Sequence, residues 1–443
     1  AQAGLAKSKV VCAWFDENYQ THSECSQLEQ FIAQQGEFVN KRVAKLAKEP
    51  PRRIGEILPI SLPSAVEEND KINFGGLAAL LLAEAKNLHN QHHHIDKNTG
   101  KTASVGLIRC ANIAPMVRVA QELFQYSETL ENTEVHLCCY HARQLLVLRN
   151  SLETKLDRIL DRSNTANLFD HPEIALAVNN SPQKHHVFIV LATPVAEVGR
   201  DHDYDWAIIE PSSMRSIIQL AGRVWRHRPE KQAQTPNIKI MAANIAALKL
   251  GNNLGVGDAV FTRPGFEEAK TPFLLSTHDV EKLISEEQLR PITAIARITK
   301  PNELQPKTQL ADLEHAVMAS LFINPKRNVV NAYWQPDSAS QACAHLQRIS
   351  PFREQAQKQD DYVCLPDDSA ESGFSFYASE LAWASGSDAA TVNSWLRFTD
   401  FQPRSAVVKP WLGESLGGAL NTLAQQLGEE EVEAVALRYA TVC

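Results

Sequence analysis

The sequence lacks the features that would assign it to a specialised class of protein. Only 19 glycines and 22 prolines occur among 443 residues, which excludes a collagen-like or low-complexity chain. The eight cysteines form no C-x-x-C pair and are too sparse for a disulfide scaffold, so we expect a reducing, cytoplasmic setting. No apolar run approaches the roughly 18 residues of a membrane-spanning helix, and the N-terminal segment has no signal-peptide pattern.

The sequence also has no overall positive charge. Its formal net charge of −8 argues against a protein coated in basic residues, although a local basic patch would still allow nucleic-acid binding. The chain is long enough for about three domains of roughly 150 residues each. It begins at Ala1 without an initiator methionine, which we interpret as a sign of processing or of a longer parent protein.

Residues 104–245 contain the clearest structural pattern, because short apolar runs alternate there with segments of helical periodicity. The expected strands are 105–110, 135–139, 187–192, 206–209 and 238–242. The expected helices are 115–124, 144–160 and 213–224. This alternation predicts an α/β fold in which a mostly parallel sheet has helices on both faces.

Two segments of this region carry residues suited to chemistry. The segment A-T-P-V-A-E-V-G-R-D (192–201) follows an expected strand, and open α/β sheets bind ligands at such strand ends. The segment Q-L-A-G-R-V-W-R (219–226), placed on a helix, puts Arg215, Arg223 and Arg226 on one face, with no acidic residue between 212 and 229. Because arginine forks bind phosphate oxygens in pairs, this face predicts a phosphate site; a solvated basic face is the simpler alternative.

These segments resemble motifs V and VI of superfamily 2 helicases. The patterns E-V-G-x-D, D-x-x-I-x-E and S-x-I-Q-x-A-G-R-x-x-R-H, at 197–201, 205–210 and 216–227, are similar to those of the CRISPR-associated helicase-nuclease of type I systems. Residues 105–112 with the following helix resemble motif IV. The segments C-A-W-F-D-E (12–17) and L-Q-R-I-S-P-F-R (346–353) indicate the type I-F (YPEST) branch.

The resemblance implies a RecA-like second helicase lobe and a division of the chain into four parts. Residues 1–70 would be a lead-in from a missing first lobe, and 71–245 the second lobe. A connector would span 246–324, and a smaller, mainly helical accessory domain would follow at 325–443, where large aromatic side chains are dense. Both the P-loop and the histidine–aspartate nuclease domain of the family lie outside what this sequence contains, so we expect the chain alone to be inactive.

The resemblance further implies an ATP-dependent single-stranded DNA translocase and nuclease that degrades foreign DNA in CRISPR interference. ATP and Mg²⁺ would be bound mainly by the first lobe, and a divalent metal by the nuclease domain; no metal ligands are expected in this chain. The implied partners are single-stranded DNA and the crRNA-guided surveillance complex, with the CRISPR adaptation integrase as a further candidate.

Residue roles follow from the same resemblance. Arg226 and Arg223 would contact the γ-phosphate of ATP, and Gln219 would position the nucleotide. Three further residues would line the nucleotide cleft: Gly199, Asp201 and Gly222. Four residues would contact the DNA backbone, where contacts track phosphates without reading bases: Asn112, His141, Arg143 and Thr193.

Two alternatives from other classes remain open at this point. The chain could be a non-catalytic remnant of a helicase that binds nucleic acid or protein, because its motifs would look the same. It could also be a metal hydrolase built on the cluster His89, His92, His93 and His94, although the glutamate of H-E-x-x-H is replaced by Asn90, and a polar helix end facing solvent is the simpler interpretation. The P-loop-like segment N-T-G-K-T (98–102) lacks the first glycine and is interpreted as a surface turn.

Overall fold

A computed structural model of the chain describes residues 12–15, 21–25, 28–62, 72–163, 167–197, 199–251, 254–255, 257–323, 361–379, 382–383 and 401–442. The chain divides into two compact units. The larger unit comprises 52–212, 216–254 and 359–443, and the smaller comprises 1–51, 213–215 and 255–358. In the described residues, no helix is both long and apolar enough to cross a membrane.

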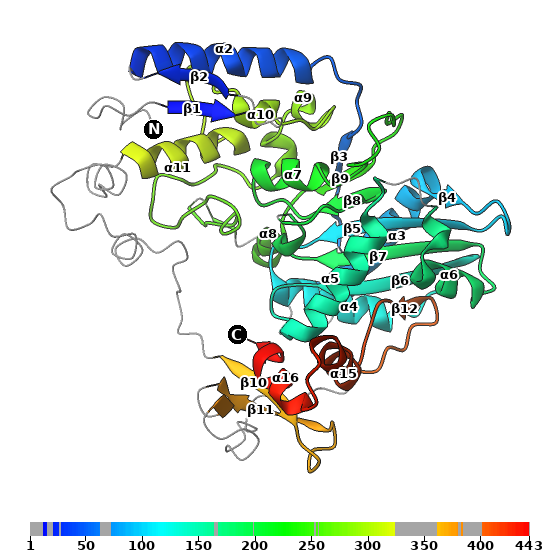
Figure 1. Cartoon of the computed structure of the whole chain (residues 1–443). Coiled ribbons are helices and arrows are strands. Elements are labelled where there is room, and N and C mark those ends of the chain that lie inside the picture. Colours follow the sequence, from blue (N-terminus) through cyan, green and yellow to red (C-terminus); the bar gives the residue numbers. More distant parts are fainter. Residues whose placement is uncertain are drawn as a thin grey trace. The chain divides into compact units, whose positions relative to one another are not determined.

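The larger unit is built on a parallel sheet with the strand order β12-β6-β7-β5-β8-β9-β3 (Figure 1). The five strands expected from the sequence are present as β5 (Thr102–Arg109), β6 (Thr133–Tyr140), β7 (His185–Ala192), β8 (Trp206–Ile209) and β9 (Ile238–Met241). Two edge strands come from outside the range 71–245: β3 (Gly55–Leu58) pairs with β9, and β12 (Val408–Pro410) pairs with β6. The short strand β4 (His94–Ile95) pairs antiparallel with β5.

One face of this sheet is buried by packing of its apolar side chains against helices. Val135 and Leu137 of β6 pack in one core with residues of α3 (Phe74–His92) and α4 (Ile113–Gln125). Because strand side chains alternate in direction, Glu134 and His136 point to the opposite face, where they line a cavity with residues of α6 (Pro172–Asn179). The expected α/β fold with helices on both faces is therefore confirmed.

The centre of the sheet is fitted around one large side chain. Trp206 on β8 is fully buried and donates from Nε1 to Ser104 Oγ at 3.0 Å. A Cβ atom at Gly106 on the neighbouring β5 would lie 2.2 Å from the Trp206 ring. Only glycine fits at position 106, so this contact is a packing requirement of the fold that the apolar run alone does not reveal.

The remaining elements of the larger unit connect or cover the sheet. They are α5 (Leu146–Leu160), η1 (Leu168–Asp170), η2 (Pro194–Ala196), α7 (Met214–Ala221, whose first two residues belong to the smaller unit) and α8 (Ile245–Leu250). The segment 96–101 forms the turn between β4 and β5, with Gly100 in the left-handed region at φ +70°. N-T-G-K-T is thus part of a hairpin turn, as expected.

The C-terminal part of the larger unit contains both helices and strands. It consists of β10 (Tyr362–Pro366), β11 (Phe374–Ala378), β13 (Thr441–Val442), α15 (Leu416–Leu427) and α16 (Val432–Tyr439). β10 pairs antiparallel with β11 and β13, and Leu420 and Val435 share a core with Val363. The expectation of a mainly helical region therefore omitted a three-stranded antiparallel sheet.

The smaller unit begins with the antiparallel pair β1 (Cys12–Phe15) and β2 (Thr21–Cys25). The long polar helix α2 (Leu28–Leu46) follows. Short helices come after residue 255: η4 (Val280–Lys282), α9 (Glu286–Leu289), α10 (Ile295–Ile298) and α11 (Leu310–Ile323). The segment 346–353, which contributed to the family resemblance, lies outside the described residues.

Candidate functional site

The carboxyl edge of the parallel sheet brings together the residues expected to contact DNA. Asn112 follows β5, His141 and Arg143 follow β6, and Thr193 follows β7. The strands β6, β7 and β5 are consecutive in the sheet. Hydrogen bonds continue past the strand ends, from Thr193 N to Tyr140 O at 3.1 Å and from Cys110 N to Ala192 O at 2.8 Å, so these loops start from one common edge.

The four residues differ in exposure. Asn112 and Arg143 are exposed, and the Asn112 side chain makes no capping hydrogen bond at the start of α4. His141 is half-buried, and its Nδ1 accepts a hydrogen bond from Arg143 N at 3.2 Å. Burial, together with Arg143 and Arg149, lowers the pKa of His141 to about 4, so this ring is neutral at physiological pH. Thr193 is buried, with 4% of its surface exposed.

The arginines of the second motif do not lie on a helix, which corrects the sequence interpretation. α7 ends at Ala221, and the chain then turns through Gly222 and Arg223 to an isolated bridge between Val224 and Tyr204. Trp225 has a φ of +50°, a left-handed conformation that is rare for a bulky residue. Arg223 and Arg226 therefore extend from a turn.

Arg226 has an acidic partner within the same unit. Its Nε donates to Asp201 Oδ1, and 42% of the Arg226 side chain and 70% of the Asp201 side chain are exposed. Partial burial would raise the pKa of Asp201, but hydrogen bonds from Arg226 and His227 outweigh it and lower that pKa. Arg226 of the second motif is therefore paired with Asp201 of the first motif.

Arg223 is buried, close enough to Arg226 and Asp201 for their charges to act on it. Its Nη2 donates to the backbone carbonyl of Glu197 at 2.9 Å, whereas its Nε is buried with no hydrogen-bond partner in the described part of the chain. Burial lowers the pKa of the Arg223 guanidinium. A buried guanidinium with a free donor is costly unless an acceptor reaches it, which makes Arg223 a candidate for binding an anion.

The remaining motif residues surround Arg223 and Arg226. Gln219 is half-buried in the last turn of α7. A Cβ at Gly222 would lie 3.1 Å from Gln219 O, so the turn after α7 is tight. Gly199 is exposed at φ +78°, a conformation that favours glycine, and it leads into Asp201.

Arg215 has separate partners in the smaller unit. Its backbone N–H donates to Glu314 Oε1 at 2.7 Å, and its guanidinium lies 5.2 Å from the centre of the Phe266 ring. α7 carries Arg215 but neither of the other two arginines. The predicted face of three arginines is therefore absent.

A buried ion pair that the sequence reading missed connects the two motifs. Arg109, at the end of β5, is fully buried and donates from Nε to Glu197 Oε1 at 2.8 Å. It also donates to Glu210 O at 2.7 Å and to Ser212 Oγ at 2.8 Å. The Ser216 hydroxyl contacts both Arg109 and Glu197. One guanidinium thus connects the ends of β5 and β8, the turn at 194–197 and the first turn of α7.

A second buried network holds the turn that carries Arg226. Arg228 donates to Asp203 Oδ2 at 3.0 Å and to Asp205 Oδ1 at 2.7 Å. Asp205 also accepts from Arg162 at 2.7 Å and from Val105 N at 2.8 Å. Both aspartates are fully buried. The only sequence signal for this network is the D-x-D spacing immediately before β8.

The histidine cluster forms no solvent-facing helix end, contrary to expectation. His89 is fully buried, and its ring nitrogens lie 2.8 Å from Ser104 Oγ and 3.0 Å from Thr102 Oγ1. His92 is also buried and lies 3.0 Å from Pro236 O. Burial is the main cause that lowers the pKa of His89 to about 3. Both histidines are therefore core residues with hydrogen-bond partners, and their contacts connect α3 to β5 and to Pro236.

Comparisons with known proteins agree with the family resemblance. The family model described as CRISPR-associated nuclease/helicase Cas3, C-terminal, matches residues 102–229. The subtype I-F/YPEST Cas3 nuclease/helicase of Pectobacterium atrosepticum is 39% identical over 374 residues, which cover 82% of this chain and 33% of that protein. The Pseudomonas aeruginosa protein of the same description is 39% identical over 376 residues, covering 83% and 33%.

Solved structures with a local likeness carry the same family name. The structure of T. fusca Cas3 with ATP is 19% identical, covering 44% of this chain and 19% of that one at a TM-score of 0.29. T. fusca Cas3 with ADP is also 19% identical, covering 48% and 21% at a TM-score of 0.32.

The curated relatives are three times as long as the part matched here, since the chain spans about one third of their length. The match to them nevertheless runs through most of the chain and includes both motifs. The chain therefore belongs to the Cas3 nuclease/helicase family, in which it corresponds to a C-terminal region of the subtype I-F/YPEST proteins.

Proposed function

We propose that this chain supplies the second helicase lobe of an ATP-dependent single-stranded DNA translocase and nuclease that degrades foreign DNA in CRISPR interference. In this proposal a first lobe provides the P-loop and the acidic magnesium site, and ATP binds between the two lobes. The chain by itself contains no G-x-x-x-x-G-K-[ST] sequence, so hydrolysis requires the other lobe. The segments 199–201 and 219–226 would complete the nucleotide site.

Arg226 would act on the γ-phosphate as an arginine finger. Its side chain is partly exposed and is paired with an even more exposed carboxylate, Asp201, so a phosphate can replace that carboxylate without entering a closed core. Asp201 would hold Arg226 in place before ATP arrives. An arginine in this role stabilises the charge that spreads over the transferring phosphoryl group.

Arg223 would bind beneath Arg226 as a second phosphate ligand. Its Nη2 is already fixed by the Glu197 carbonyl, and its Nε donor is free. Gln219 lies one turn earlier and would position the nucleotide or the attacking water. Gly199 and Gly222 would let the nucleotide approach the backbone on either side, since neither has a side chain that projects into this space.

The DNA backbone would run along the carboxyl edge of β5, β6 and β7. Asn112 and Arg143 are exposed there and offer an amide and a guanidinium to phosphate oxygens. The neutral His141 ring would add a hydrogen bond rather than a charge. Thr193 is buried, so we propose that it shapes the loop through its backbone bond to Tyr140 and reaches DNA only through the loop's backbone.

The cofactors and partners follow from the family. ATP with Mg²⁺ would bind mainly to the first lobe, and a divalent metal would serve the nuclease domain. The partners would be single-stranded DNA, the crRNA-guided surveillance complex and the adaptation integrase.

The observation that carries the proposal is the exposed Arg226–Asp201 pair above a buried Arg223 with a free donor. The test is Arg226→Ala in the full-length protein, with ATP hydrolysis measured in the presence of single-stranded DNA. We expect turnover to fall by about 10³-fold or more, while DNA affinity stays unchanged because Arg226 lies on the nucleotide side.

Two control variants make this test specific. Arg226→Lys keeps the charge but loses the planar fork, so it should recover only a small part of the activity. Arg143→Ala should weaken DNA binding and reduce its salt dependence, since one phosphate contact is removed, while basal hydrolysis without DNA is retained. Near-normal DNA-stimulated turnover of Arg226→Ala would contradict the proposal.

A further inference from the structure

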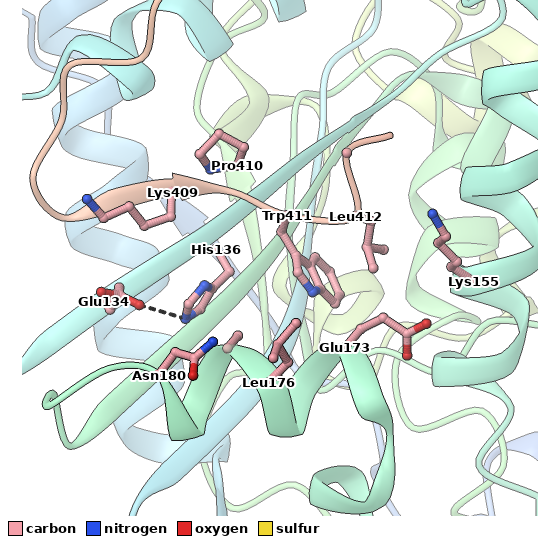
Figure 2. A pocket seen from close by; sticks show the side chains of 12 residues that line it. Glu134, His136, Lys155, Glu173, Leu176, Asn180, Lys409, Pro410, Trp411 and Leu412 are labelled. Carbon is pink, nitrogen blue, oxygen red and sulfur yellow. Dashed lines mark ion pairs between the residues drawn. The ribbon is translucent and has the colours of Figure 1, made fainter. Parts of the chain in front are cut away.

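Three potential metal ligands lie on one face of the sheet, away from the carboxyl edge. Glu134 and His136 are two residues apart on β6, so their side chains point the same way. On the neighbouring strand β7, His186 is the register partner of Glu134. The sheet geometry therefore places a carboxylate and two imidazoles at the corners of a small triangle, as Figure 2 shows for Glu134 and His136.

The distances within this triangle suit a single small cation. His136 Nε2 lies 3.1 Å from His186 Nδ1 and 3.6 Å from Glu134 Oε1. The three ligand atoms all lie within 4.8 Å of one another. Ligand atoms about 2.0 Å from a tetrahedral zinc ion are separated by about 3.3 Å, so two of the three separations already match without movement of the strands.

The hydrogen bond between His186 and Gln183 fixes which nitrogen of His186 can accept. His186 Nε2 lies 3.1 Å from the carbonyl oxygen of Gln183. Because a carbonyl can only accept, Nε2 carries the proton and Nδ1 presents its lone pair toward His136 and Glu134. A ring N–H bound to a backbone carbonyl is also the contact that orients metal-binding histidines.

The two rings are held in place by burial and stacking. His136 and His186 are almost fully buried, and the His136 ring stacks on Phe188 with centroids 4.4 Å apart.

We infer that Glu134, His136 and His186 form a zinc site whose fourth position opens to a neighbouring cavity. The cavity has a volume of about 480 Å³ and is lined by Glu134, His136, Trp411 and α6 residues that include Glu173 and Asn180 (Figure 2). Two histidines and one carboxylate are a known ligand set of zinc sites that keep a water in the fourth position. The site is distinct from the nucleotide and DNA surfaces proposed above, because it lies at the opposite ends of β6 and β7.

Two charged side chains, Glu134 and Lys409, lie beside the proposed zinc position. Glu134 supplies the negative charge, and the nearby Lys409 directs its ammonium group to the carbonyl of Ser405 at 3.5 Å.

The competing explanation is a plain hydrogen bond in which His136 Nε2–H donates to His186 Nδ1. That arrangement satisfies both rings without a metal, and it predicts no zinc affinity.

The test measures zinc binding to the chain after treatment with a chelator. We expect isothermal titration with ZnCl₂ to show one tight site per chain, and Co²⁺ to give the visible absorption of a four-coordinate site. Zinc should also raise the melting temperature of the wild-type chain, since it binds only the folded state. This last readout needs no variant to fold.

Two variants and one control locate the ion. Glu134→Gln and His186→Gln should each weaken zinc binding by at least about tenfold, since the loss of even an outer-shell partner costs that much. His185→Gln is the matched control, because His185 is adjacent in sequence but contacts Thr102 Oγ1 at 2.9 Å. No tight zinc site in the wild type, or equal affinity in Glu134→Gln, would overturn the inference and leave the plain hydrogen bond.

Discussion

Arg109 illustrates how one buried side chain can order loops that are distant in sequence. Its three guanidinium nitrogens contact Glu197, the Glu210 carbonyl and the hydroxyls of Ser212 and Ser216. A fully buried charge is tolerated only when it is paired and hydrogen-bonded, and here both conditions hold. The same contacts set the backbone of Glu197, whose carbonyl in turn receives Arg223.

Replacement of Arg109 by Met should therefore destabilise the protein strongly. The variant leaves the Glu197 carboxylate buried without its counter-charge, which costs about 3–5 kcal/mol when a buried pair is broken. Urea unfolding followed by circular dichroism measures the change. Arg118→Met, on the exposed surface of α4 with a partner at 3.9 Å, should cost no more than about 1 kcal/mol; equal effects of the two substitutions would contradict the account.

Among the elements, the segments 199–205 and 222–228 together determine the position of Arg226. They lie side by side through the Tyr204–Val224 bridge and through the contacts of Arg228 with Asp203 and Asp205. Arg53 adds a hydrogen bond to Val224 O at 3.0 Å. The turn that presents Arg226 is thus fixed on both sides, which an arginine finger requires if it is to meet a phosphate without reorganisation.

The ion pairs of Asp205 should make the stability of the protein depend on pH. Burial would raise the pKa of Asp205, but Arg162, His94 and Arg228 together hold it well below its usual value. The folded-state pKa is therefore below the unfolded value of about 3.9. The carboxylate stabilises the fold above about pH 4, and that stabilisation is lost as the pH falls through the folded-state pKa.

Asp205→Asn should remove this contribution. The variant should be less stable than the wild type at pH 7, and its free energy of unfolding should fall less steeply as the pH drops below about 4. Denaturant unfolding at several pH values measures both effects. A wild-type slope in Asp205→Asn would show that Asp205 does not carry the acid sensitivity.

The sequence predicted the central elements because buried parallel strands are read as continuous apolar runs. β5 to β9 were located in this way, whereas β3 and β12 lie outside the alternating region. The end of α7 was misplaced because apolar residues continue at helical spacing to Trp225. The turn depends on the left-handed conformation of Trp225, which no residue preference predicts.

Within the candidate site, sequence patterns grouped the correct loops but not their internal pairing. Asp201 and Arg226 are 25 residues apart, and Arg109 and Glu197 are 88 apart. Such pairs depend on strand order, which spacing along the chain does not contain. The zinc ligands escaped notice for the same reason, since His186 meets Glu134 only through the register of β6 and β7.

At the level of the whole molecule, we propose that this chain is one half of a motor. The net charge of −8 does not conflict with this role, because the proposed anion contacts are made by a few arginines at one edge of the sheet. Arg223 and Arg226 offer donors for phosphate, but the sequence contains no P-loop. Chemistry would arise only when a P-loop lobe faces these arginines.

The most direct test is ATP hydrolysis by the purified 443-residue chain with single-stranded DNA, measured alone and after addition of the P-loop lobe of a type I-F relative. The account predicts only background hydrolysis by the chain alone. It predicts DNA-stimulated hydrolysis once the lobe is added to the wild-type chain, and none with Arg226→Ala. Hydrolysis by the chain alone that is lost in Arg226→Ala, or equal stimulation of both chains, would contradict it.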